Sequence, residues 1–231
     1  MAKRGVIIVA GGSGQRMQSA LPKQFLMLGG MPVVARTINT FAETLPKAEI
    51  VVVLPEDHIP LWRNLMARFD VAVHKCVAGG KERFHSVKCG ISALSDEVEY
   101  IAIHDGVRAL VSKPLIIRTM LDAEVHEASI PVTTVADSYR RITDDGSTIV
   151  PRSELRIVQT PQIFSAKLLR EAYDVEYDPS FTDDASVVEA YGHPISLVEG
   201  DARNIKLTTP NDLAYAEWLL ESEANTRSES R

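Results

Sequence analysis

The stretch Val6-Ile7-Ile8-Val9-Ala10-Gly11-Gly12-Ser13-Gly14-Gln15-Arg16-Met17 joins a short apolar run to a loop rich in glycine. The apolar run is rich in β-branched residues, which is typical of a buried strand in a parallel sheet. The glycines end that strand and let the backbone N–H groups approach phosphate oxygens closely. This stretch predicts a strand, a phosphate-binding loop and a helix, the unit from which α/β folds are built.

Two better-known phosphate loops do not match this spacing. The dinucleotide fingerprint requires a third small residue where Met17 stands, and the Walker loop requires a lysine directly after Gly14. The glycines alone fit a plain strand–helix turn equally well. Arg16 and Lys23 favour a phosphate site, because an arginine fork and a lysine ammonium together can bracket a triphosphate. The alternative for each is an ordinary solvated surface cation.

The rest of the chain repeats the same alternation. Further strands are predicted at 50–54, 72–73, 100–103, 130–135 and 195–198. Helical patterns follow Pro32, cover 61–68 and 115–125, and follow Thr209, which has Pro210 behind it as a first-turn residue. The pattern predicts one α/β domain over 1–231, with a mostly parallel twisted sheet and helices on both faces. A disordered tail is expected at 222–231.

One segment, at about 136–157, breaks this rhythm. Two β-rich runs flank Thr143-Asp144-Asp145-Gly146, and Asp-Gly between such runs predicts a hairpin. A two-stranded ribbon alone is marginally stable in water. We therefore expect a β-arm that packs against a second subunit.

Composition narrows the classes of function. The chain has 231 residues, is 45% hydrophobic and carries a formal net charge of −6. A negative chain argues against nucleic acid or a membrane surface as the main partner, although a local cluster of cations still suits an anionic small molecule. The two cysteines, Cys76 and Cys89, have no metal-type spacing, and no segment approaches a membrane span. We expect a cytoplasmic protein.

Six motifs in the same order resemble those of the 2-C-methyl-D-erythritol 4-phosphate cytidylyltransferases. They lie at 10–17 with 22–25, 79–87, 104–108, 159–164, 182–186 and 204–208. The resemblance implies a Rossmann-like nucleotidyltransferase fold with a dimerisation arm. It also implies CTP and a phosphorylated polyol as substrates, Mg²⁺ held mainly by the CTP phosphates, and a homodimer with shared active sites.

The resemblance also implies roles for individual residues. The predicted catalytic cations are Arg16 and Lys23 at the α-phosphorus, with Arg152 and Lys206 at the acceptor's phosphate. The predicted substrate-binding residues are Ala10, Gly11, Gly12, Gly14, Gly80, Ser86, Asp105, Arg108, Ser138, Thr160 and Thr182, and no residue is assigned to a metal. Gly80 and Ser86 match positions that read cytosine. Ordinary structural roles compete at several positions: Thr182 would also suit a helix N-cap, and Lys206 could flank an edge strand.

The implied reaction needs no protein nucleophile. A phosphate monoester has a second pKa of about 6, so the acceptor is already largely dianionic at neutral pH. Cations that offset the repulsion between two anions are the expected catalysts. Two alternatives stay open: a ribitol 5-phosphate cytidylyltransferase, and a catalytically idle nucleotide-binding protein on the same fold.

Overall fold

The computed structural model describes residues 2–12, 17, 19 and 21–229, apart from the side chains of 224 and 226–229. The main sheet contains β1 (Arg4–Val9), β4 (Glu49–Leu54), β5 (Lys75–Ala78), β6 (Tyr100–Asp105), β7 (Ala128–Thr134), β10 (Arg156–Val158), β11 (Gln162–Ser165) and β12 (Ser196–Glu199). The α-helices are α1 (Val33–Thr44), α2 (Ile59–Met66), α3 (Arg83–Ala93), α4 (Lys113–His126), α5 (Ala166–Ala172), α6 (Asp184–Ala190) and α7 (Pro210–Glu229). Short elements complete the fold: η2 (Lys23–Phe25), η3 (Glu56–His58), η4 (Arg152–Glu154) and the hairpins β2 (Met27–Leu28) with β3 (Met31–Pro32) and β8 (Tyr139–Thr143) with β9 (Gly146–Val150).

In the described part of the chain, the main sheet has eight strands in the order β10-β7-β11-β6-β1-β4-β5, with β12 paired to β7. Strands β1, β4, β5 and β6 pair in parallel, and β12 is parallel to β7. Strands β10 and β11 run antiparallel to their neighbours. The predicted mostly parallel α/β sheet is confirmed, with two antiparallel strands that the local pattern did not indicate.

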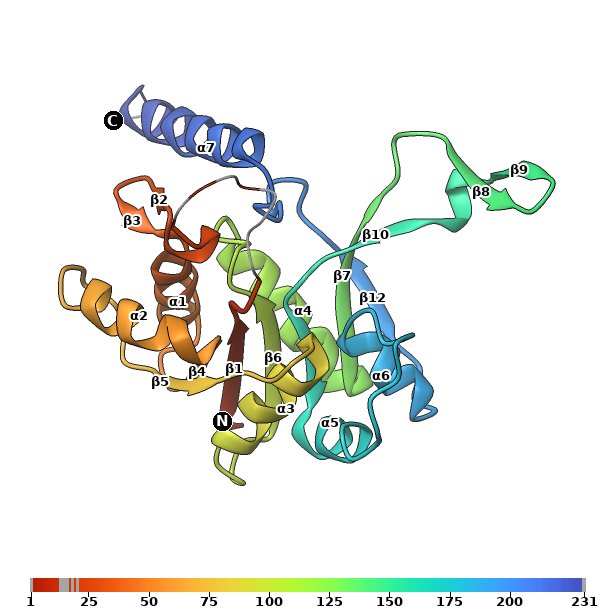
Figure 1. Ribbon diagram of the computed structural model, residues 1–231, viewed down its shortest axis with the longest axis horizontal. Helices are drawn as coiled ribbons and strands as arrows, with labels where there is room; N and C mark the ends of the chain where they lie inside the picture. Colours follow the sequence, from red (N-terminus) through yellow and green to blue (C-terminus); the bar gives the residue numbers. More distant parts are fainter. Residues whose placement is uncertain (1, 13–16, 18, 20, 230–231) are drawn as a thin grey trace.

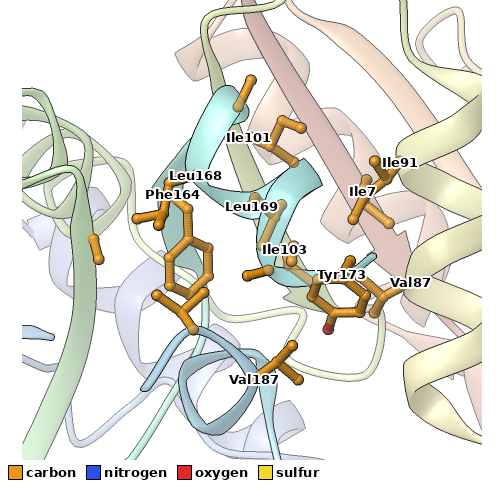
Figure 2. Packing of buried hydrophobic residues seen from close by; sticks show 14 of the residues in the cluster. Ile7, Val87, Ile91, Ile101, Ile103, Phe164, Leu168, Leu169, Tyr173 and Val187 are labelled. Atoms are coloured by element: carbon orange, nitrogen blue, oxygen red, sulfur yellow. The ribbon is translucent and has the colours of Figure 1, made fainter. Parts of the chain in front are cut away.

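Helices cover both faces of the sheet, and strand β1 explains why (Figure 1). Successive side chains of a strand point to opposite faces. Ile7 packs in the cluster formed with α3, α5 and α6, whereas Ile8 packs in the cluster formed with α1, α2 and α4. Both side chains are fully buried. Figure 2 shows the first cluster, where Leu169 of α5 lies beside Phe164 of strand β11. A continuous apolar strand is therefore what a sheet buried on both faces requires.

Two local predictions differ from the structure. The strand expected at 72–73 is instead β5, which begins at Lys75, and Val73 is 96% exposed. The loop before β5 is held by Asn39, whose amide binds the carbonyl of Asp70 and the N–H of Ala72. Those bonds occupy backbone groups that a strand would need for its ladder.

The expected tail at 222–231 is the second difference, because helix α7 continues through Glu229. The helix has a strong start, since Asp212 accepts hydrogen bonds from the N–H groups of Thr208 and Thr209 at 2.9 and 2.8 Å. The predicted Thr209 cap is confirmed by its Oγ1, which accepts from the Asp212 N–H at 3.3 Å. Once a helix is nucleated, extending it by one residue costs little.

The predicted hairpin is present as β8 and β9, with Thr143 paired to Gly146 across the turn. Gly146 has a φ of 134°, a conformation that favours glycine. The hairpin projects away from the rest of the chain (Figure 1). Ile142 and Ile149 on it are 80% and 72% exposed.

No helix in the described residues is both long enough and apolar enough to cross a membrane.

Candidate active site

The site lies where strands β1 and β6 end side by side. Val9 pairs with Asp105 in the sheet, and the chain leaves both strands at their carboxyl ends. Strand β1 has β4 on one side and β6 on the other, so the strand order reverses at this point. Ligands of open α/β sheets bind at such reversal points. A cavity of about 240 Å³ is found here, lined by residues of the glycine loop, the start of α3, and Asp105, Val107 and Lys206.

The glycine loop forms one wall of this cavity. Ala10, Gly11 and Gly12, three of the residues predicted to contact the nucleotide, line it, and Gly11 and Gly12 are exposed to solvent. Lys23 begins η2 and lies against the loop: a Cβ built on Gly12 would be 3.2 Å from its Cε and 3.5 Å from its Nζ. The predicted neighbours Gly14 and Arg16 lie outside the described residues. The structure therefore brings one predicted cation to the loop.

Gly80 and Ser86 form the opposite wall, at the start of α3. The Ser86 hydroxyl accepts a hydrogen bond from the Gly80 N–H at 3.2 Å and lies 3.2 Å from the carbonyl of Glu82, to which it can donate. A Cβ at Gly80 would stand 2.3 Å from the Cβ of His85, so only glycine fits this backbone path. Backbone and hydroxyl groups held this firmly can distinguish one base edge from another.

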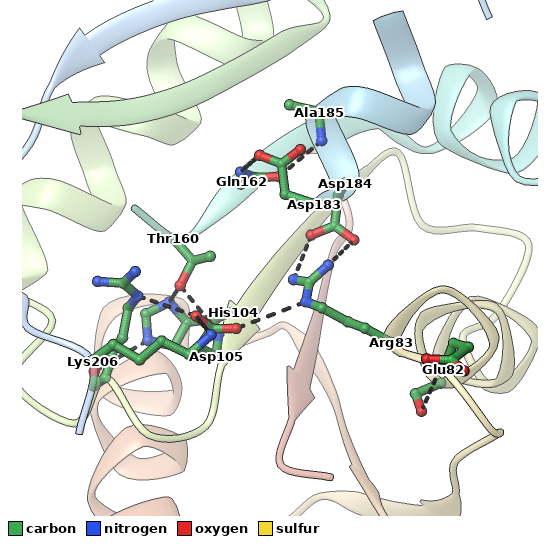
Figure 3. A network of polar contacts seen from close by, with 12 residues as sticks. Glu82, Arg83, His104, Asp105, Thr160, Gln162, Asp183, Asp184, Ala185 and Lys206 are labelled. Carbon is green, nitrogen blue, oxygen red and sulfur yellow. Dashed lines mark hydrogen bonds and ion pairs between the residues drawn. The ribbon is translucent and has the colours of Figure 1, made fainter. Parts of the chain in front are cut away.

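Asp105, at the end of β6, is the electrostatic centre of the site (Figure 3). Its carboxylate lies 3.0 Å from the Lys206 ammonium, 3.2 Å from Nε of Arg108 and 3.9 Å from Nε of Arg83. Burial alone would raise the pKa of Asp105, but these three cations outweigh it and hold the pKa well below its usual range. Asp105 is therefore ionised at neutral pH, and it gathers three cations at the mouth of the cavity.

Arg83 lies within the motif at 79–87, but the sequence alone predicts no role for it. Its two terminal nitrogens each lie 2.7 Å from an oxygen of Asp184, which is fully buried at the start of α6. Burial opposes the charge on Arg83, but Asp184 raises the pKa of the guanidinium above its usual value. The two residues are 101 positions apart, so no local spacing could have paired them.

Asp183 and Asp184 bind different partners, because Asp184 pairs with Arg83 and Asp183 caps α6. Asp183, not Thr182, is the N-cap of α6: its carboxylate accepts from the N–H of Ser186 at 2.9 Å. Asp183 also accepts from the amide of Gln162 at 2.8 Å. Thr182 therefore does not act as the N-cap, which was the alternative to its predicted role in substrate binding.

A second cavity of about 280 Å³ adjoins the first and shares Arg83, Asp105 and Lys206 with it. Its other lining residues include Thr160, Thr182 and Arg108, all three predicted to bind substrate. The two cavities are thus separated by one acidic and two basic side chains.

The hydroxyl of Thr160 lies 3.0 Å from Nδ1 of the fully buried His104. The Nε2 of His104 lies 3.2 Å from the carbonyl of Arg108, which can only accept, so Nε2 carries the hydrogen. Burial lowers the pKa of His104 to about 4, so the ring is neutral and its Nδ1 accepts from the Thr160 hydroxyl at 3.0 Å. The Thr160 oxygen in turn accepts the Asp105 N–H at 3.1 Å. His104 therefore orients the strand end that carries Asp105.

Two predicted residues are not brought to this place. In the described part of the chain, Ser138 and Arg152 do not line either cavity. Both are exposed near the β8–β9 hairpin, and Arg152 donates to the carbonyl of Ala136 at 3.1 Å. Among the described residues, the first cavity is therefore lined by Ala10, Gly11, Gly12, Gly80, Ser86 and Lys206, but not by Ser138 or Arg152.

A mostly parallel sheet whose strand ends carry a glycine-containing loop, a cavity and gathered cations is typical of an α/β nucleotidyltransferase. The sequence pattern of the 2-C-methyl-D-erythritol 4-phosphate cytidylyltransferase family matches residues 5–222. The chain belongs to this family.

Individual relatives agree with this assignment. A 2-C-methyl-D-erythritol 4-phosphate cytidylyltransferase of Bacteroides fragilis is 50% identical over 219 residues, which is 94% of this chain and 99% of the relative. The crystal structure of 4-diphosphocytidyl-2C-methyl-D-erythritol synthase from Anaerococcus prevotii superposes with a TM-score of 0.81 at 29% identity, covering 95% of this chain and 96% of that one. The Thermus thermophilus cytidylyltransferase structure gives 0.75 at 32% identity, covering 95% and 98%.

Proposed function

We propose that this site transfers CMP from CTP to 2-C-methyl-D-erythritol 4-phosphate, giving 4-diphosphocytidyl-2-C-methyl-D-erythritol and pyrophosphate. The observation that carries the proposal is the pair of adjoining cavities. One lies against the glycine loop, Gly80 and Ser86, and the other against Thr160 and Thr182. Two anionic substrates need adjoining sites with cations between them, and Arg83 and Lys206 line both cavities.

In this reaction an oxygen of the acceptor's phosphate attacks the α-phosphorus of CTP. The new P–O bond forms as the bond from the α-phosphorus to the bridging oxygen breaks, and pyrophosphate leaves with the electron pair. The dianionic acceptor needs no general base. Lys23, beside the glycine loop, is positioned to stabilise charge on the triphosphate, and Lys206 to hold the acceptor's phosphate. Arg16 has the first of these roles in the proposal as well.

Mg²⁺ is the proposed cofactor, bound mainly through the CTP phosphates. Among the described residues, no three His, Cys, Asp or Glu side chains are grouped closely enough to hold a metal ion. The Asp105 carboxylate already faces three protein cations, so the phosphates are the better oxygen ligands. When bound, the ion would neutralise part of the triphosphate charge.

The proposed assembly is a homodimer in which each arm completes the other subunit's site. Ser138 and Arg152 match acceptor-binding positions of the family, yet both stand away from the cavities of their own subunit. Ile142 and Ile149 are exposed on the same hairpin, and apolar side chains of this size favour burial against a partner. We also propose the cytoplasm as the compartment, because Cys76 and Cys89 are both unpaired.

The test is release of pyrophosphate by the purified protein from CTP and 2-C-methyl-D-erythritol 4-phosphate with Mg²⁺. We expect turnover with this pair. We expect little turnover when ribitol 5-phosphate replaces the acceptor, or when UTP or ATP replaces CTP. A preference for ribitol 5-phosphate would replace the acceptor, and binding of CTP without turnover would leave an idle nucleotide-binding protein. CTP with Mg²⁺ should also raise the melting temperature, whereas ATP should not.

A further inference from the structure

Arg83 occupies the boundary between the two cavities. It is the first residue of α3, directly before the turn that holds Ser86 at the nucleotide cavity. Its side chain lines both cavities, and its Nε lies 3.9 Å from Asp105. Arg83 is thus in a position to influence both substrates.

The guanidinium of Arg83 is bound by Asp184, the first residue of α6 (Figure 3). Asp184 binds both terminal nitrogens at 2.7 Å, and it also accepts a hydrogen bond at 2.6 Å from the hydroxyl of Tyr173, the residue that ends α5. A guanidinium is planar, so fixing two of its nitrogens fixes the direction of the third. The third nitrogen points toward Asp105, as the dashed lines in Figure 3 show.

Stability alone is a poor explanation for this arrangement. Burying Asp184 completely and Arg83 in part costs solvation free energy, and well-packed apolar side chains of similar volume are often as stable or more so. Apolar side chains would nevertheless lack directed donors. The bidentate pair ties the start of α3, which faces the nucleotide, to α6, whose N-cap Asp183 lines the acceptor cavity beside Thr182.

We propose that Arg83 is a positioning residue that couples the nucleotide cavity to the acceptor cavity, with Asp184 fixing its orientation. On the nucleotide side, Arg83 fixes the position of the start of α3. On the acceptor side, it fixes the position of the Asp105 carboxylate, which is paired with Lys206 and Arg108. The inference rests on the proposed function for the identity of the two substrates. It adds that one side chain aligns both of them.

The decisive measurement is the Michaelis constant for each substrate in Arg83→Lys and Asp184→Asn. The lysine keeps the charge but loses the fork, and the asparagine keeps the shape but loses the charge. We expect the KM for CTP and the KM for the acceptor each to rise about tenfold or more, because small misplacements of groups at a reacting centre have effects of this size. The double variant should be no worse than the worse single variant, since both changes remove one shared interaction.

Two kinds of control separate coupling from general damage. Arg4→Lys alters an ion pair of the same 2.7 Å length, between Arg4 and Glu124, and should leave both KM values unchanged. Ser86→Ala should raise the KM for CTP alone, and Thr182→Ala that for the acceptor alone. The proposal is overturned if folded Arg83→Lys changes neither KM or only one of them, or if Arg4→Lys gives the same two-sided effect.

Hydrogen exchange provides a readout that needs no turnover. The Ser86 amide bonds to the Glu82 carbonyl and the Arg108 amide to the Asp105 carbonyl, one on each side of Arg83. Without substrate, Arg83→Lys should speed exchange of both amides, and exchange unchanged at either would contradict the coupling.

If wild-type protein shows no turnover, the proposed function fails while this measurement still decides the role of Arg83. If neither variant folds, Tyr173→Phe, which removes one hydrogen bond to Asp184, should give the same two-sided effect at smaller size.

Discussion

The carboxyl edge of the sheet around Asp105 and the β8–β9 hairpin place their charged side chains in opposite surroundings. At the sheet edge, the carboxylate of Asp105 is surrounded by three cations, and its backbone N–H donates to Thr160, which in turn bonds to the buried His104. On the hairpin, Arg140 bonds to Ser147 across the ribbon, and the apolar Ile142 and Ile149 face solvent. The first region is held by contacts within the chain, while the second exposes apolar side chains that would be covered in the proposed homodimer.

This difference bears on how the two kinds of predicted site residue work. Groups at the sheet edge are held by the core of their own subunit, so they are preorganised before substrate binds. Groups on the hairpin depend on whatever the hairpin packs against. Assembly should therefore matter to the acceptor side of the site more than to the nucleotide side, and the following experiments test that distinction.

The largest effect is expected at the nucleotide side. Lys23→Ala should lower kcat by about 10³-fold or more, with a much smaller change in CTP affinity, because the ammonium acts on charge that develops in the transition state. Steady-state kinetics and CTP titration measure the two quantities separately. Lys47→Ala, a lysine at the opposite end of the sheet, serves as the control and should behave as wild type. A raised KM for CTP with an unchanged kcat would show that Lys23 only binds the substrate. Arg16→Ala should resemble Lys23→Ala.

The next effect tests whether the arm serves its own subunit or the partner. Lys23→Ala and Arg152→Ala homodimers should each be nearly inactive. When they exchange subunits, a swapped arm creates one site with both defects and one with neither in each mixed dimer, so about a quarter of the wild-type activity should return from an equal mixture. No recovery, with exchange shown independently by mass spectrometry, would place Arg152 at its own subunit's site.

A third measurement concerns the buried support of the sheet edge. His104 has a pKa of about 4 when folded against 6.5 when unfolded, so the unfolded state takes up the proton first as the pH falls. The stabilising contribution of neutral His104 is complete above pH 6.5 and should decline by about 3 kcal/mol as the pH falls to 4. Denaturant unfolding of wild type and His104→Gln across this range isolates the contribution. Parallel pH profiles for the two proteins would show that His104 does not titrate as described.

The smallest change is expected on the hairpin, and it contrasts with the core. Ile103→Ala removes a fully buried side chain and should cost about 2–5 kcal/mol of unfolding free energy. Ile142→Ala should change the stability of the subunit by only about 0.5 kcal/mol or less. It should nevertheless raise the dissociation constant of the dimer, as measured by analytical ultracentrifugation. An unchanged dimer would show that this face of the hairpin is not the interface.

Local sequence signals predicted much of the fold. The β-branched run before Gly11 and the Asp-Gly turn of the hairpin were identified correctly, because strand and turn conformations depend on near neighbours. Strand β11 was not predicted as a strand, since its four residues are buried through pairing with β6 and β7, strands that precede it in the chain. The tail at 222–231 was assigned to disorder from its polar composition, whereas α7 continues to Glu229, because the helix is already nucleated at Thr208–Asp212.

The sequence by itself determined the α/β class and the family, because both depend on short motifs and their order. The roles of the cations stay predictions. Only the tertiary structure decided which side chains act together. Arg83 meets Asp184 across 101 residues, and His104 meets Thr160 across 56. Such pairs form because the sheet brings distant strand ends and helix starts to one edge, and burial then requires each polar group to find a partner there.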